Sequence, residues 1–182
     1  RQGLITVILF ISSIIAQNTY LEKFNPDSLR FKTSYATRCI EAPYIDGKLD
    51  DDSWVQATPV NEFFQIEPIE LSAPSEQTVV RVAYDDNAIY VAFENFDSQP
   101  DKIRRPLTRR DNWMDGFSST SDFVGFAIDS KNDDYNGNFF AVNAAGVKID
   151  VALSGHEDYD PSWDAVWDVG IDIHDSGWTA EF

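Results

Sequence analysis

The chain has 182 residues and a formal net charge of −17, because 31 Asp and Glu residues oppose 14 Lys and Arg residues. Such a surface repels phosphate backbones and anionic lipids, which excludes nucleic acid as an expected partner and favours neutral ligands or divalent cations. Because the chain has one cysteine, an internal disulfide and a cysteine-based zinc cluster are excluded. With two histidines, a Ser–His–Asp triad is not indicated.

The N-terminus carries an apolar run, Leu4–Ala16, behind a single basic residue, Arg1. The run is shorter than the ~20 residues that a membrane-spanning helix needs. It has the length of a signal-peptide core and ends in a small residue. We therefore expect residues 1–16 to be a signal peptide of a protein exported to the periplasm, the outer membrane or the cell exterior. A buried N-terminal strand or helix is the alternative.

Residues 17–41 are polar and irregular and are expected to be a leader to a domain over residues 42–182. Three aspartates precede Ser53 and Trp54, which predicts a short helix near 51–57, since acids suit a helix N-terminus. Three prolines in 58–76 predict a loop with one edge strand near 61–66.

Beyond residue 76 the apolar residues recur with a period of two, which is typical of half-buried strands. Turns rich in Asp, Asn and Gly separate these segments, and no long 3.6-residue period occurs. The predicted strands cover residues 78–84, 89–93, 122–129, 138–143, 147–153 and 167–173. Many short strands joined by turns predict an all-β protein, either a sandwich or a barrel.

Five segments, in this order, are similar to family 9 carbohydrate-binding modules. They are Ile45–Trp54, Val80–Val91, Asp122–Asp129, Phe140–Asn143 and Gly177–Glu181. The Trp163–Trp167 element and the long leader resemble most a branch of exported bacterial proteins, in which such a domain precedes a C-terminal outer-membrane β-barrel-like region. The resemblance implies an antiparallel, immunoglobulin-like β-sandwich. It also implies that the C-terminal strands are missing from this sequence, which we interpret as a fragment.

The sugar clamp of the family does not carry over to this sequence. In sugar-binding members, two tryptophans hold a terminal glucose unit, helped by a glutamate and an arginine. The first tryptophan aligns with Ser119, the glutamate with Gly125 and the arginine with Ala141. The second tryptophan would lie beyond Phe182. Either the chain binds sugar differently, or the fold serves another purpose.

The five tryptophans fall into two groups. Trp54, Trp167 and Trp178 belong to apolar strand or helix faces and are expected in the core. Trp113 and Trp163 lie in loops among polar residues, and Asp111 and Asn112 lie beside Trp113. Because sugar rings stack on aromatic planes while polar neighbours bind the hydroxyls, Trp113, Trp163, Asp111 and Asn112 are the predicted ligand-binding residues. Loop anchoring is the alternative role.

One turn concentrates oxygen ligands that suit Ca²⁺: Asp129, Asn132, Asp133 and Asp134, with Asn136 beside them. The spacing is not that of an EF-hand, since Phe140 stands where the last ligand would be. A calcium site is the hypothesis here, and a solvated hairpin turn is the alternative.

Carboxylates are abundant, but no pair stands out as the two acids of a glycosidase. No organic cofactor is expected. The sequence favours a non-catalytic carbohydrate-binding module of an exported protein involved in polysaccharide binding or breakdown, whose partners are a glycan and a downstream domain of the same chain. The alternative is a structural or interaction domain attached to an outer-membrane β-barrel, without sugar binding. The full-length parent would be a glycoside hydrolase or an outer-membrane protein.

Overall fold

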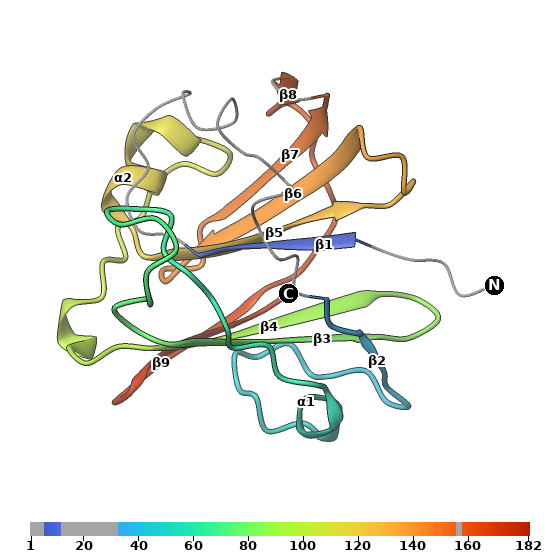
Figure 1. The fold of residues 1–182 in the computed structure, drawn as a ribbon, viewed down its shortest axis with the longest axis horizontal. Helices are drawn as coiled ribbons and strands as arrows, with labels where there is room; N and C mark the ends of the chain where they lie inside the picture. The colour runs from blue at the N-terminus through green and yellow to red at the C-terminus, as the bar shows by residue number, and fades with distance from the viewer. Residues whose placement is uncertain (1–5, 12–32, 156–157) are drawn as a thin grey trace. The chain divides into compact units, whose positions relative to one another are not determined.

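The computed structural model describes residues 6–11, 33–155 and 158–182, and Figure 1 shows their fold. The chain forms two compact units. One contains Arg105–Val166 together with strand β1 (Thr6–Ile11), and the other contains the described residues up to Arg104 together with Trp167–Phe182. Each unit is built around one five-stranded sheet.

The sheet of the first unit is antiparallel throughout and has the order β1-β5-β6-β7-β8. Its remaining strands are β5 (Phe123–Asp129), β6 (Asn136–Asn143), β7 (Lys148–Ser154) and the three-residue edge strand β8 (Asp158–Asp160). A π-helical turn, η4 (Trp113–Phe117), and a short helix, α2 (Ser118–Thr120), precede β5. The core of this unit contains Phe117, Phe123, Ala141, Val147 and Ile149.

The sheet of the second unit has the order β2-β3-β4-β10-β9. The strands are β2 (Thr37–Arg38), β3 (Thr78–Tyr84), β4 (Ile89–Phe96), β9 (Gly170–His174) and β10 (Gly177–Glu181). Only the short pairing of β2 with β3 is parallel. Helix α1 (Asp52–Gln56) and the 3-10 turn η3 (Pro100–Lys102) complete this unit, and one of its core clusters joins Cys39, Trp54, Ala83 and Ala92.

The all-β class and the alternating strands are confirmed, whereas an immunoglobulin-like topology stays a prediction. Helix α1 and the burial of Trp54 and Trp178 were also predicted correctly. Half-buried Trp167 stacks on Phe182, with ring centroids 5.5 Å apart.

One strand prediction is wrong, and another is right only in part. Residues 61–66 form no strand, because the pairing there is a single bridge between Val60 and Val80. The predicted strand at 167–173 is displaced, since β9 starts only at Gly170 and residues 163–169 have no regular structure.

The N-terminal segment bears on the signal-peptide prediction. Thr6–Ile11 pairs with β5 as strand β1. A strand in this segment is what the alternative to a signal peptide predicted. Residues 1–5 and 12–32 lie outside the described residues, and the signal peptide stays a prediction. The last residues of the predicted leader take part in the fold, because they supply β2 and the buried Cys39.

A fully buried carboxylate, Glu181 on β10, fixes the segment before α1 to the second sheet. Its Oε2 accepts the backbone N–H groups of Asp46 and Gly47, at 3.0 and 2.6 Å, and its Oε1 accepts the indole N–H of Trp54 at 2.6 Å. Burial raises the pKa of Glu181, although these three donors act in the opposite direction. Gly47 is required here, because its φ is +92° and a Cβ would lie 2.5 Å from the carbonyl carbon of Ile171.

We predict that Glu181→Gln lowers the free energy of unfolding by about 3 kcal/mol, because the amide NH₂ would face a buried N–H donor and leave it unsatisfied. Urea unfolding of the full chain measures the effect. The matched control is Asp86→Asn, which removes an exposed carboxylate paired with Arg38 and should cost less than about 0.5 kcal/mol. Equal effects of the two substitutions would contradict the anchoring role of Glu181.

Candidate functional site

The strongest candidate site is a trough along β6, β7 and β8, with a cavity volume of about 380 Å³. The register of the three strands explains its shape. Ala152 on β7 stands opposite Asn138 on β6 and Asp160 on β8, and Ser154 stands opposite Asn136 and Asp158. Because directly opposed residues point to the same side of a sheet, small side chains form the floor and longer ones form two walls.

The two walls of the trough differ in chemistry. Asn136 and Asn138 give β6 an amide wall, whereas Asp158 and Asp160 give β8 a carboxylate wall. The walls belong to strands separated by β7, so they stand about 10 Å apart, which is two strand spacings. Both walls of the trough therefore carry hydrogen-bonding groups. Three further residues contribute to the lining, although their register places their side chains on the other side of the strands: Gly137, Leu153 and Tyr159.

Trp163, a predicted ligand-binding residue, lies next to this trough. Its backbone N–H donates to the carbonyl of Asp160 at 3.4 Å. Its ring packs edge-to-face with Phe140, at a centroid distance of 5.8 Å, and Phe140 follows Asn138 on the same face of β6. The ring is half-buried, and Trp163 follows the lining residue Asp160 without itself lining the trough.

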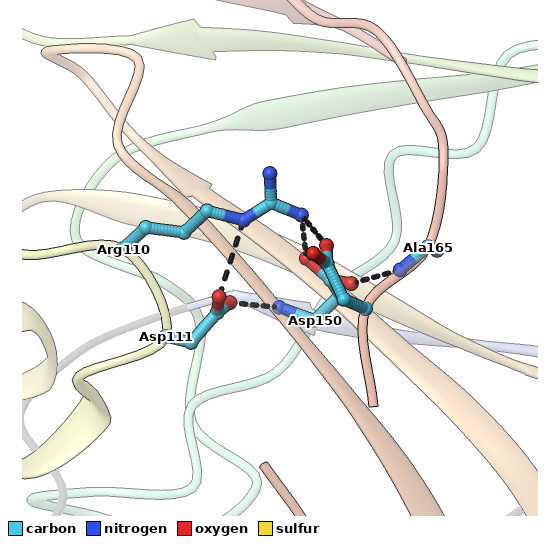
Figure 2. A network of polar contacts seen from close by, with 5 residues as sticks. Arg110, Asp111, Asp150 and Ala165 are labelled. Atoms are coloured by element: carbon cyan, nitrogen blue, oxygen red, sulfur yellow. Dashed lines mark hydrogen bonds and ion pairs between the residues drawn. The ribbon is translucent and has the colours of Figure 1, made fainter. Parts of the chain in front are cut away.

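The irregular segment that carries Trp163 is held to β7 by Asp150, as Figure 2 shows. Asp150 lies on the same face of β7 as Ala152 and is fully buried. Its Oδ2 accepts the backbone N–H of Ala165 at 2.6 Å, and its Oδ1 accepts Nη2 of Arg110 at 2.8 Å. One strand residue therefore fixes both the segment behind Trp163 and an arginine from another part of the chain.

Arg110 is shared by three carboxylates. It donates through Nε to Asp111 at 3.1 Å and through Nη2 to Asp164 as well as to Asp150. The hydrogen bond to Asp150 is the main reason that the pKa of Arg110 lies above its usual value. Burial and the nearby Asp150 raise the pKa of Asp111, although this carboxylate also accepts the backbone N–H of Asp150 at 3.0 Å. The network thus holds a cationic guanidinium in an otherwise acidic surrounding.

The other predicted ligand-binding residues do not join the trough. Trp113 packs in the aromatic cluster of the first unit, with ring centroids 5.2 Å from Phe123 and 5.5 Å from Phe117. Both carboxylate oxygens of Asp111 are engaged in the Arg110 network. The backbone N–H of Asn112 donates to the carbonyl of Arg109. Trp113 and Asp111 thus have the geometry of loop anchors, and a ligand-binding role for them stays a prediction.

The positions that correspond to the family's sugar clamp lie away from the trough. Gly125 and Ala141 are paired across β5 and β6, and both are buried. A Cβ at Gly125 would lie 2.9 Å from the ring of Phe139, so a glutamate has no room there. Only Ser119 is exposed. Two of the positions that the resemblance aligns with the clamp are therefore packed in this structure.

The predicted calcium turn connects β5 and β6 at one end of the trough. Asp129 accepts the backbone N–H groups of Lys131 and Asp134, and Asp133 accepts those of Tyr135 and Asn136. A hydrogen bond from the Asn136 side chain is the largest of several causes that lower the pKa of Asp133. Asn132 and Asp134 have positive φ, as turn residues do. No cluster of three or more His, Cys, Asp or Glu residues able to hold a metal occurs among the described residues, and calcium binding stays a prediction.

Sequence reasoning missed most of the trough. Asn138 and Ser154 belong to alternating strands and look there like ordinary solvent-facing residues. The available signal was a polar face on two strands that flank a third, β7, with small residues. The sequence analysis named Asn136 only as a neighbour of the calcium turn, and Trp163, which lies next to the trough, as a ligand-binding residue.

Comparisons of the chain with protein-family models, with curated proteins and with solved structures find no match. Within the described part of the chain, no helix has the length and apolarity needed to span a bilayer.

We predict that Arg110→Ala lowers the free energy of unfolding by about 2 kcal/mol, because it leaves the buried Asp150 carboxylate without its cation. The Arg110 side chain is 44% exposed, so the cost is smaller than for a fully buried pair. Urea unfolding measures it. Asp164→Asn is the control, since Asp164 is 70% exposed and contacts the same guanidinium, and it should cost less than about 0.5 kcal/mol. A larger cost for Asp164→Asn than for Arg110→Ala would contradict the central role of Asp150.

Proposed function

We propose that the chain is a non-catalytic glycan-binding domain of an exported protein, and that the β6–β7–β8 trough is its binding site. The observation that carries the proposal is the pairing of two polar walls over a floor of small residues, with the half-buried Trp163 at its side. Sugars need such a site, because their hydroxyls require hydrogen-bonding partners while their C–H faces favour an aromatic ring.

The hydrogen-bonding groups of the trough suit a sugar. Amides both donate and accept, so Asn136 and Asn138 can satisfy a hydroxyl in either role, whereas ionised Asp158 and Asp160 only accept. The negative charge of the chain opposes binding of polymers rich in uronic acids or sulfate.

Binding fits this geometry better than hydrolysis does. Asp158 and Asp160 are the carboxylates of the trough, and they stand on the same wall because they alternate along one strand. Glycoside hydrolysis uses two carboxyl groups that flank the scissile bond. A sugar in the trough would meet carboxylates on one side and amides on the other.

We predict that Trp163→Ala weakens glycan binding about tenfold, or about 1.4 kcal/mol, because the ligand loses its aromatic contact. Asn138→Ala should weaken binding about fivefold, through the loss of one hydrogen bond of about 1 kcal/mol. Affinity gels containing glucan, xylan or chitin-derived polymers identify the ligand, and calorimetry measures the affinity. Val166→Ala, at an exposed position of the same segment, is the control and should not change binding. Retention on none of these polymers would contradict the proposal.

A second candidate function rests on a different surface, an apolar loop of the second unit. Phe64, Ile66, Ile69 and Leu71 are each between 49% and 67% exposed. The loop is nevertheless braced by its own hydrogen bonds, from Gln65 N–H to the Ser72 carbonyl at 3.0 Å and from Leu71 N–H to the Gln65 carbonyl at 2.9 Å. Ordered apolar groups that face solvent mark interaction sites, so this loop favours the interaction-domain alternative, with a protein surface as the partner.

Site-specific photo-crosslinking distinguishes this second function. A crosslinker at position 69, in the cells that produce the protein, should join the loop to one defined polypeptide, such as the outer-membrane β-barrel region that the family resemblance implies. Position 55 is the control, since Val55 is 76% exposed but lies on α1, outside the loop. Equal crosslinking at both positions would contradict an interaction specific to the loop.

A further inference from the structure

The charge of the trough is asymmetric, which bears on the kind of sugar that it would select. The carboxylate wall consists of Asp158 and Asp160, which face the same side of edge strand β8. The amide wall across the floor is neutral. A ligand with a positive charge on one edge and hydroxyls on the other would match both walls.

Asp160 is held in place by its own turn. The backbone N–H and the hydroxyl of Ser162 both donate to its Oδ1, at 2.9 and 2.6 Å. These hydrogen bonds lower the pKa of Asp160, so the carboxylate is ionised at neutral and mildly acidic pH. A fixed, ionised carboxylate in a groove is preorganised to accept hydrogen bonds from an ammonium group.

Among the described residues that line the trough, Lys131 is the one basic residue, and it has a nearby carboxylate of its own. Lys131 lies in the turn that closes one end of the groove. Its charge is close enough to Asp133 to contribute to the lowered pKa of that carboxylate, behind the larger effects of hydrogen bonding. Lys131 therefore acts on the turn as well as on the groove, and the β8 wall keeps its negative character.

We infer that the trough selects glycans that contain amino sugars with a free, protonated amine, such as glucosamine oligomers, over their N-acetylated counterparts. The ammonium group would face Asp158 and Asp160, and the ring hydroxyls would face Asn136 and Asn138. Acetylation removes the charge and adds bulk, so the same sugar would lose its contact with the acidic wall. This inference rests on the proposed glycan-binding function of the same site.

Calorimetry on the full chain, with glucosamine oligomers and N-acetylglucosamine oligomers of equal length at about pH 6, tests the inference. The deacetylated oligomer should bind about tenfold more tightly. The double substitution Asp158→Asn/Asp160→Asn should erase this preference and leave a comparable residual affinity for both oligomers. The control Asp101→Asn/Asp175→Asn makes the same change in net charge at exposed positions of the second unit and should keep the preference.

The outcomes separate the two levels of the proposal. Equal affinity for both oligomers, with sensitivity to Asn138→Ala, would overturn amino-sugar selection and leave glycan binding intact. A preference that both double substitutions reduce alike would also overturn it, because the attraction would then come from the overall charge of the chain. Binding of neither these oligomers nor any neutral glycan would overturn the proposed function and the inference together.

Discussion

The geometry of the candidate site depends on one buried carboxylate, Asp150. A buried charge is tolerated only when hydrogen bonds and an opposite charge replace the lost water. Asp150 meets this requirement by binding Arg110 and the backbone N–H of Ala165. Asp150 therefore fixes a segment without regular structure beside strand β7, because its buried carboxylate needs hydrogen-bond donors. This constraint acts together with the hydrogen bond from Trp163 N–H to the Asp160 carbonyl and the ring contact with Phe140, which also place Trp163.

The second unit also contains a buried carboxylate that accepts backbone N–H groups. Glu181 is buried on β10 and binds the backbone N–H groups of Asp46 and Gly47 together with the indole of Trp54. In each unit, a buried carboxylate on a strand accepts hydrogen bonds from backbone N–H groups of a segment that is not part of the sheet. All-β units with short strands leave many loop N–H groups to be satisfied, and an acidic sequence supplies the acceptors. Part of the large negative charge is thus structural rather than only a solubility feature.

The sequence predicted the strands well and the site poorly, for one physical reason. Alternation along a strand is a local property, so the period of two located β3 to β7 and the acids before Trp54 located α1. A binding surface on a sheet is defined by the register between strands, which depends on turn length and on core packing. Asn138, Ala152 and Asp160 become neighbours only through that register. Strand β9 starts three residues later than the alternation of residues 167–173 predicts, since residues 167–169 have no regular structure.

The predicted loop tryptophans show how packing decides between two roles for one residue type. Trp113 and Trp163 have similar polar neighbours in the sequence, yet they occupy different surroundings. The π-helical turn η4 brings Trp113 against Phe117 and Phe123, where an indole stabilises the core by removing apolar area from water. Trp163 packs edge-to-face with Phe140 and follows an edge strand of only three residues. The contacts that each ring makes, and not its polar neighbours in the sequence, therefore decide whether a loop tryptophan joins the core of its unit.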